Sequence, residues 1–338
     1  MALPTSHFRL FACCRPVRGA RRSVICDLQR GTFVFIPNGL YDILTQHQSH
    51  TVDAIKALYE HRYDEVIDEY FAFLIEHEYG FWCDEPELFP DLDLTWQRPE
   101  QITNAILDVD EHSTHDVASL VAQLDDLGCK ALQVRFYSPC TVETLTHLLE
   151  HTRSGRLRTI ELLMPYSAAL SHEALCTLCH TYHRISRIFV HTAPEDTVKT
   201  LEALDVDICY RRQRVDAPSC CGEVHAEYFV TGLELFTEAQ QYNTCLNHKL
   251  SIDARGEIKN CPAMTQSFGN VRDVSLHSAL AHTRFKELWS INKDQIDVCK
   301  DCEFRYICTD CRAYITRPAD LYSKPAKCTY DPYTAQWH

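Results

Sequence analysis

The stretch Cys299-Lys-Asp-Cys-Glu-Phe-Arg-Tyr-Ile-Cys-Thr-Asp-Cys311 decides how the C-terminal part of this chain folds, and Cys328 follows it after one intervening segment. Thiols spaced CxxCxxxxxCxxC can converge on one or two metal centres, because a two-residue gap lets neighbouring sulfurs face the same point. Packing alone gives no reason for two CxxC pairs. The spacing therefore predicts a metal-binding C-terminal region.

Length and composition predict a multidomain protein of the reducing cytoplasm. The chain has 338 residues, which exceeds the usual size of one domain, so two or three domains are expected. It contains no apolar run of about 18 residues and its first residues lack the apolar core of a signal peptide, so we predict neither a membrane span nor secretion. The 18 cysteines are then expected to be metal ligands and ordinary buried thiols rather than disulfides.

The charge distribution argues against a nucleic-acid partner. The net charge is −14 at pH 7, whereas phosphate binding needs clustered lysines and arginines. A local basic patch is the exception, formed by Arg15, Arg18, Arg21 and Arg22. This patch fits a solvated loop and a site for an acidic peptide equally well.

Residues 1–95 predict a small α+β module. A β-branched and aromatic run over Arg30–Pro37 predicts a strand, with a turn at Asn38-Gly39. Two amphipathic helices follow, one from Thr51 and one from about Asp64, and a short strand closes the module near Gly80.

This order of strands and helices resembles the winged-helix PqqD-like recognition domain of ribosomal-peptide maturation enzymes, most visibly over Thr32–Gly80. The resemblance implies that the leader of a precursor peptide adds as an extra strand to the exposed edge of the sheet. The alternative is a winged-helix module that only packs against the rest of the chain.

An α/β pattern follows an acidic, proline-containing linker at residues 84–93. Amphipathic helices over Val117–Leu127 and Val142–Leu149 alternate with strands, which predicts a parallel sheet and an incomplete barrel rather than a full eightfold one. The expected strands are Ile102–Val109, Ala131–Phe136, Leu157–Met164, Ile185–His191 and Val206–Tyr210.

Polar residues follow the first two of these strands, at residues 108–116 and 135–140, where the chemistry of a barrel is normally found. They are interpreted as helix-capping loops in preference to a metal or peptide site.

Several cysteines are better explained by packing than by chemistry. Cys176 and Cys179 form a CxxC pair, but they lie on an apolar helical stretch, where cysteine behaves as a small apolar residue. The same interpretation covers Cys26, Cys83 and Cys129, whereas the adjacent Cys13 and Cys14 fit no partner pattern.

A hairpin is predicted upstream of the cysteine run. Leu250, Ile252 and Ile258 alternate around an Asp-Ala-Arg-Gly turn that ends at Gly256, so the open end of the hairpin would bring Cys245 and Cys261 together. A helix carrying Phe285, Leu288 and Trp289 is expected after it.

These cysteines together are similar to the seven-cysteine SPASM motif, which holds auxiliary iron–sulfur clusters in radical-SAM enzymes that modify peptides. The motif runs through Cys245, Cys261, Cys299, Cys302, Cys308, Cys311 and Cys328. The short sequence motifs around these cysteines, such as Phe268-Gly-Asn-Val271, resemble those of the SPASM-domain peptide maturase of grasp-with-spasm systems. The resemblance implies three domains: a PqqD-like domain over residues 1–95, a degenerate radical-SAM-like partial barrel over 96–218 and a SPASM domain over 219–338. It also implies two partners, a precursor peptide and an ATP-grasp ligase.

Carried over by position, the resemblance assigns two [4Fe-4S] clusters. The first takes Cys299, Cys302, Cys308 and Cys328, and the second takes Cys245, Cys261 and Cys311. Cys221 is the candidate fourth ligand of the second cluster, with Cys220 or His248 as the fallback. Zinc is the competing metal, because sets of four thiolates suit it equally well.

The chain departs from the family in two places. SPASM domains usually place three residues where this chain has only Thr309 and Asp310, between the last two cysteines of the run. Radical-SAM proteins carry a CxxxCxxC loop after the first barrel strand, and this motif occurs nowhere in the chain. AdoMet cleavage is therefore not expected.

Two functions stay open. In one, the protein is a maturation partner without radical chemistry, which binds the leader and presents the peptide to a ligase, with structural clusters or zinc. In the other, it is a redox enzyme that modifies the peptide directly through an auxiliary cluster with an open iron site.

Overall fold

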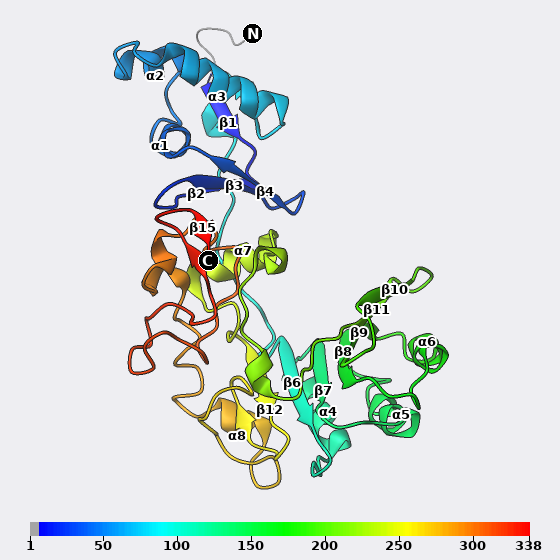
Figure 1. Cartoon of the computed structure of the whole chain (residues 1–338). Coiled ribbons are helices and arrows are strands. Elements are labelled where there is room, and N and C mark those ends of the chain that lie inside the picture. The colour runs from blue at the N-terminus through cyan, green and yellow to red at the C-terminus, as the bar shows by residue number, and fades with distance from the viewer. Residues whose placement is uncertain (1–6) are drawn as a thin grey trace. The chain divides into compact units, whose positions relative to one another are not determined.

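The computed structural model describes residues 7–338, and Figure 1 shows the chain. These residues form two compact units. The first unit holds the chain up to Trp96 together with Val224–Thr244 and Ile291–His338, and the second holds Gln97–Glu223 and Cys245–Ser290. The three domains predicted from the sequence stay a prediction, because each compact unit combines stretches that are far apart in the sequence.

The N-terminal part of the first unit contains a three-stranded antiparallel sheet of order β2-β3-β4, formed by Cys14–Val17, Ser23–Asp27 and Thr32–Ile36. Strand β1 (His7–Leu10) pairs antiparallel with β5 (Gly80–Cys83). The helices are α1 (Asn38–Gln46), α2 (Val52–Leu58) and α3 (Asp64–Glu76). The predicted strand near Thr32, both predicted helices and the closing strand are confirmed, although the PqqD-like assignment stays a prediction.

The predicted turn at Asn38-Gly39 is wrong, because Asn38 begins α1. Its side chain is held by the loop before β3 and by the first residue of β3: Nδ2 donates to the Gly19 carbonyl at 3.2 Å, and Oδ1 accepts from the Ser23 hydroxyl at 2.6 Å. With those bonds made, Leu40 and the following apolar residues turn into the core as a helix.

Strand β3 is buried along its whole length because the sheet is covered on both faces. Ile25 joins the core made with the helices α1 to α3. Val24 and Cys26 point the other way, into a second core that contains Phe304, Ile307 and Cys308 of the cysteine-rich segment. Within the first unit, the N-terminal sheet therefore packs directly on that segment.

The second unit contains an eight-stranded sheet of order β10-β11-β9-β8-β7-β6-β12-β13. Neighbours from β11 to β12 run parallel, and β10 and β13 are antiparallel at the two ends. The strands are β6 (Asn104–Val109), β7 (Ala131–Phe136), β8 (Thr159–Pro165), β9 (Ile185–His191), β10 (Thr197–Leu201), β11 (Val206–Tyr210), β12 (Lys249–Ile252) and β13 (Ile258–Lys259). The mostly parallel sheet and its five predicted strands are confirmed, and it is open in the part of the chain described.

The two faces of this sheet differ in polarity. On β7, Leu132, Val134 and Phe136 enter the core that also holds the apolar side chains of the helices, whereas Gln133 and Arg135 point to the opposite face. The helices α4 (Val117–Asp126), α5 (Val142–Glu150) and α6 (His172–Thr181) lie along one side of the sheet in Figure 1.

The remaining elements are short. The first unit adds α7 (Leu233–Gln241), β14 (Tyr330–Asp331) and β15 (Gln336–Trp337), and the second adds α8 (Leu276–Leu280). Single 3-10 turns occur at Pro86–Leu88, Pro218–Cys220, Ala226–Tyr228, Lys293–Gln295 and Cys299–Asp301. The predicted helix over Phe285–Trp289 is wrong: this stretch forms turns, although both aromatic ends are buried in the core. None of the helices described is long and apolar enough to span a membrane.

Candidate metal centres

Four of the predicted ligands gather in the first unit, around one lysine. Cys299 is acted on electrostatically by Cys308 and Cys328 as well as by Lys293. Cys302 is acted on by Cys308 and by the same lysine. The four thiols of the first predicted cluster are therefore close enough for their charges to interact.

Local backbone structure brings these cysteines together. Cys299 opens a 3-10 turn, and the Cys302 amide donates to its carbonyl at 3.0 Å, so the two-residue gap bends as the spacing predicts. Cys328 lies 17 residues after Cys311 and forms an isolated parallel bridge with Val224.

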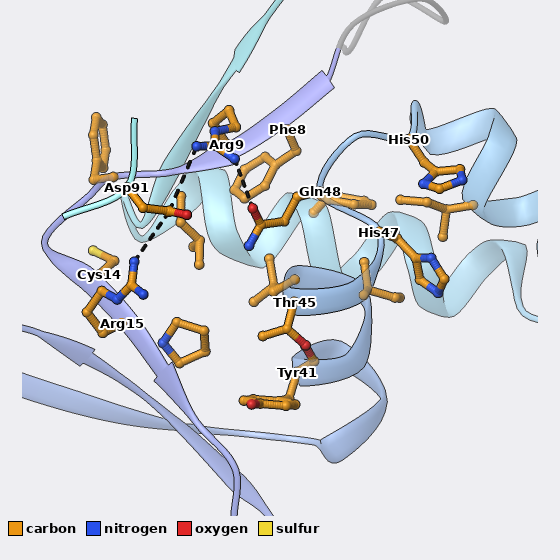
Figure 2. A pocket seen from close by; sticks show the side chains of 17 residues that line it. Phe8, Arg9, Cys14, Arg15, Tyr41, Thr45, His47, Gln48, His50 and Asp91 are labelled. Carbon is orange, nitrogen blue, oxygen red and sulfur yellow. Dashed lines mark hydrogen bonds and ion pairs between the residues drawn. The ribbon is translucent and has the colours of Figure 1, made fainter. Parts of the chain in front are cut away.

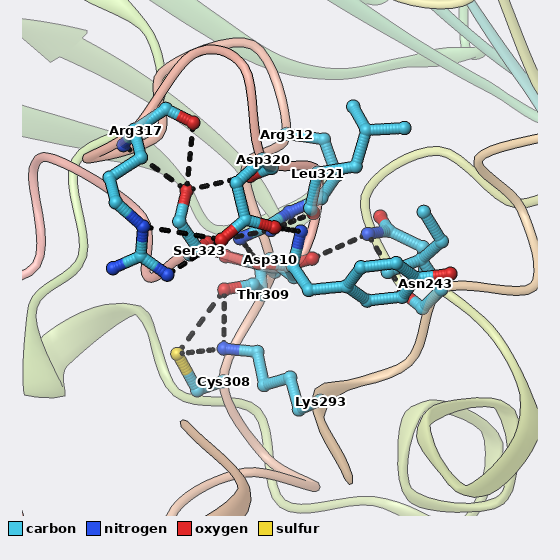
Figure 3. Close-up of polar contacts among 12 residues, drawn as sticks. Asn243, Lys293, Cys308, Thr309, Asp310, Arg312, Arg317, Asp320, Leu321 and Ser323 are labelled. Atoms are coloured by element: carbon cyan, nitrogen blue, oxygen red, sulfur yellow. Dashed lines mark hydrogen bonds and ion pairs between the residues drawn. The ribbon is translucent and has the colours of Figure 1, made fainter. Parts of the chain in front are cut away.

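Lys293 is the charged residue of this site that the sequence did not reveal. It is buried, and its Nζ donates to Cys308 Sγ and to the Thr309 carbonyl, both at 2.9 Å (Figure 3). The nearby Asp310 carboxylate is engaged elsewhere, by Arg312 Nη2 at 2.7 Å and by Asn243 Nδ2 at 2.6 Å. Among the residues described, no carboxylate forms an ion pair with Nζ, so this buried ammonium faces sulfur.

The electrostatics of the pair favour an anionic group at this place. Burial alone would lower the pKa of Lys293, but the charges of Cys308, Cys299 and Asp310 together raise the pKa above its ordinary value. Four thiolates on iron or zinc carry net negative charge, which the buried ammonium would balance. The residues present therefore fit a tetrathiolate metal group.

The metal-free thiols of Cys299, Cys302 and Cys308 are expected to be protonated, because their pKa values are raised. Burial raises the pKa of Cys299 to about 12, with Lys293 opposing the shift. Since a thiol must lose its proton to bind a metal, loading of this site releases protons and becomes weaker at low pH.

A second group of thiols lies in the second unit, at the open end of the predicted hairpin. β12 and β13 form this hairpin, and its turn places Gly256 at a φ of +87°. Burial first, and then the charge of Cys245, raises the pKa of Cys261 to about 12. Cys221 acts on Cys261 as well, so all three thiols lie near one another.

Lys249, at the start of β12, accompanies this second group. Its Nζ lies 3.9 Å from Cys245 Sγ. Burial opposes the charged form of Lys249, yet Cys245, Cys261 and Cys221 raise its pKa overall. Each cysteine group thus has its own lysine.

The other candidate ligands of the second cluster are placed differently. Cys311 is buried in the first unit, whereas Cys221, Cys245 and Cys261 belong to the second. Of the two fallbacks, Cys220 lies 3.8 Å from the Arg214 carbonyl, and Nδ1 of His248 contacts the Glu100 carbonyl at 2.8 Å.

A comparison with protein families identifies the cysteine-rich region. Residues 244–303 match the family model of the SPASM iron–sulfur cluster-binding domain. This part of the chain is similar to a SPASM domain. Its matched part spans the hairpin of Cys245 and Cys261 and the first CxxC pair, so iron–sulfur binding is the property expected of these cysteines. The number of clusters and the individual ligands stay predictions.

Solved structures give a more distant likeness. One is Streptococcus suis SuiB bound to S-adenosylmethionine, with 10% identity and a TM-score of 0.34, covering 93% of this chain and 95% of that one. Another is Streptococcus suis SuiB bound to its precursor peptide SuiA, with 10% identity and a TM-score of 0.36, covering 96% and 98%. No curated protein matches the sequence. These TM-scores are too low to establish a common fold, and the absence of AdoMet cleavage stays a prediction.

The strand ends of the sheet hold a buried ion pair that the sequence did not predict. Arg135 Nε donates to Asp108 Oδ1 at 2.6 Å and its Nη2 to Oδ2 at 2.9 Å, and the Tyr137 hydroxyl lies 3.2 Å from Oδ2. Burial raises the pKa of Asp108 despite these partners. The capping interpretation of this region holds for Asp116, whose carboxylate accepts from the Ser119 amide at the start of α4.

Most of the remaining cysteines pack as predicted. Cys26, Cys129 and Cys179 are at most 1% exposed. Cys83 and Cys176 are half-buried.

The basic patch is largely paired within the chain. Arg15 Nη1 lies 3.4 Å from Asp91, Arg18 pairs with Asp42, and Arg22 Nε donates to Glu303 at 2.9 Å. The interpretation as a free site for an acidic peptide is weakened, because these arginines already have carboxylate partners.

Proposed function

We propose that this protein matures a ribosomally synthesised peptide: it binds the leader of the precursor through its N-terminal module and carries two [4Fe-4S] clusters in its SPASM region. It acts with an ATP-grasp ligase and does not cleave AdoMet itself. A bound cluster supplies electron transfer and stabilises the loop-rich segment that holds it.

The observation that carries the proposal is the packing of the N-terminal sheet on the cysteine segment within the first unit. Arg22 bonds Glu303, which directly follows the ligand Cys302, and Glu303 is fully buried. The Ala20 amide donates to the Asp301 carbonyl at 2.7 Å. The predicted peptide-binding module and the first predicted cluster are therefore parts of one folded body.

The sheet also has an edge suited to an added strand. Its edge strands are β2 and β4, and β4 pairs only with β3 among the residues described. Pro16 removes a backbone donor from β2, so β4 is the better edge for an incoming peptide. On β4, Phe35 is 43% exposed, and its ring lies 5.8 Å from that of Phe304 in the cysteine segment. A leader bound here would lie close to the first cluster.

Metal analysis tests the first half of the proposal. Anaerobically purified protein should contain about eight iron atoms per chain if both clusters are of the [4Fe-4S] type. Mössbauer spectra should show one cluster lost in Cys299→Ala/Cys308→Ala and retained in the control Cys83→Ala. Iron-free protein that holds zinc at these cysteines would overturn the iron–sulfur assignment.

Peptide binding and mass measurements test the second half. A precursor peptide should bind more weakly to Phe35→Ala than to the wild type, whereas Leu58→Ala, at an exposed apolar residue of α2, should leave the affinity unchanged. Its mass should change only when the ligase and ATP are added, with or without AdoMet. A mass change without the ligase would replace this function by direct redox modification.

Direct redox modification is the second candidate, and the thiol group of the second unit favours it. Cys221 is exposed and lies near the buried Cys261. A cluster held by three thiolates has an iron atom that is open to substrate or solvent. Mössbauer spectra that show a site-differentiated iron would support this candidate.

A further inference from the structure

A third group of metal-binding side chains lies in the N-terminal module, outside the SPASM cysteines. The Sγ atoms of Cys13 and Cys14 and a carboxylate oxygen of Asp27 all lie within 4.8 Å of one another. Among the residues described, this is the one group of three or more such atoms that is so compact. A spacing of this size suits a single ion.

The backbone brings the three residues together and holds them. Cys14 and Asp27 are cross-strand partners of β2 and β3, and both are at most 2% exposed. The Cys14 amide donates to the Phe11 carbonyl at 2.8 Å, and the Leu28 amide donates to the Cys13 carbonyl at 2.9 Å. The turn before β2 is thereby tied to the turn after β3, and the ligand atoms need no large rearrangement to meet.

The carboxylate of Asp27 has one oxygen that accepts backbone amides and one that lies near a shared arginine. Its Oδ1 accepts the backbone amides of Gln29 at 3.1 Å and Arg30 at 2.9 Å. Its Oδ2 is 3.6 Å from Arg30 Nη1, and the same guanidinium donates to Glu78 at 2.6 Å. A buried carboxylate beside two thiols, with its nearest cation shared, is a site that a divalent cation would neutralise.

We propose that Cys13, Cys14 and Asp27 bind one zinc ion. Sulfur ligands select zinc over the oxygen-preferring calcium and magnesium, and two thiolates with a carboxylate leave one tetrahedral position. The Oε1 of Gln29, 3.7 Å from Cys13 Sγ, or a water molecule fills that position. Binding releases the two thiol protons, so the site goes from two neutral thiols and one carboxylate to a complex of net charge −1 beside Arg30.

The ion would act on the module that is proposed to bind the peptide. It would pin β2 to the turn between β3 and β4, which fixes the edge of the sheet. Cys14 also lines a cavity of about 180 Å³ between β1, β2 and α1, shown in Figure 2. Because both thiols must lose their protons to bind the ion, zinc binding should weaken as the pH falls.

Metal counts on the full-length, iron-loaded protein test the site. Plasma mass spectrometry should find about one zinc per chain in the wild type and in Cys83→Ser. Zinc should fall to near zero in Cys13→Ser/Cys14→Ser, with iron unchanged. The Cys299→Ala/Cys308→Ala variant should lose the iron of the first cluster and keep this zinc, which separates the outcome from that of the proposed function.

Asp27→Asn provides a variant that retains both thiols. It should weaken zinc binding by at least ~10-fold in competition with a chromogenic chelator, by analogy with the ~10–100-fold losses seen when metal-site partners are removed. With Co²⁺ in place of zinc, thiolate-to-cobalt absorption should appear in the wild type and be absent from the double serine variant. Equal zinc in the wild type and the double variant would overturn the proposal. So would a Cys13–Cys14 disulfide in anaerobically prepared wild type.

Discussion

Replacing Lys293 with methionine should affect the metal-free and metal-loaded proteins in opposite directions. Lys293→Met keeps the length of the side chain and removes its charge. In the metal-free protein the buried ammonium faces neutral thiols and a carbonyl, so an apolar replacement should be neutral or stabilising. In the loaded protein the same ammonium offsets the negative charge of the cluster, so its loss should be destabilising.

The size of the effect follows from the short contact. Nζ lies 2.9 Å from Cys308 Sγ, and the charge of a cluster would be centred a few ångströms beyond the sulfur. Two unit charges ~4 Å apart interact by ~4 kcal/mol at an effective dielectric constant of ~20, so ~2–3 kcal/mol is expected at the longer distance. For a one-electron couple, a tenfold change in the equilibrium constant corresponds to 59 mV, so the reduction potential of the cluster in Lys293→Met should be lower by ~90–130 mV.

Three measurements check this prediction. Thermal unfolding of metal-free and loaded protein should show that iron stabilises the variant less than the wild type, by ~2–3 kcal/mol. Cluster loss to a chelator should be faster in the variant. An EPR-monitored redox titration should give the lower midpoint potential.

Lys300→Met is the matched control, because Lys300 follows Cys299 directly but is exposed to water. Its charge is screened, so its removal should shift the potential by far less. If Lys293→Met destabilised both forms equally and left the potential unchanged, Lys293 would be only a packing residue, and the electrostatic argument for an anionic cluster would be refuted.

Three further predictions concern the rest of the fold. Asp108→Asn should cost ~3–5 kcal/mol in urea unfolding because it strands the buried Arg135 guanidinium, whereas replacing both residues with apolar ones should restore most of the loss. Gly19→Ala should lower the unfolding temperature, since the added methyl would overlap a backbone carbonyl, whereas Gly232→Ala enters open space and should not. Burial raises the pKa of Cys129 to about 12. The free energy of unfolding should therefore fall as the pH rises from 9.0 towards that value, by up to ~1.4 kcal/mol per pH unit. Cys129→Ala should remove this contribution to the pH dependence of stability.

The regular part of the fold could be predicted because its pattern is local. Ala131–Phe136, Ile185–His191 and Val206–Tyr210 are strands with the predicted bounds, since short apolar runs between amphipathic helices leave little choice of structure. Strand β10 was missed because its residues are mostly exposed and it forms only by pairing with β11. The Asn38 turn was wrong for a similar reason: the loop that holds its side chain comes from earlier in the chain.

The candidate sites also differ in how much of each could be predicted from the sequence. The CxxC spacing is visible in the sequence, and the first pair, Cys299 and Cys302, closes within one turn. Lys293 could not be predicted, since a lysine in a polar stretch normally lies at the surface and its burial depends on cysteines later in the chain. The site of Cys13, Cys14 and Asp27 needed the register of β2 on β3, and no local spacing encodes that register.

The contrast between these groups of cysteines bears on which metal each would hold. A mononuclear site requires all its donor atoms around one ion, and in the described part of the chain only Cys13, Cys14 and Asp27 are that close. Cys299, Cys308 and Cys328 are electrostatically coupled to one another yet do not form so compact a group. A cluster binds each thiolate through a different iron atom, and it therefore accommodates the wider spacing with a shared countercharge at Lys293. On these two proposals, zinc and iron contents should vary independently when the two sets of cysteines are replaced in turn.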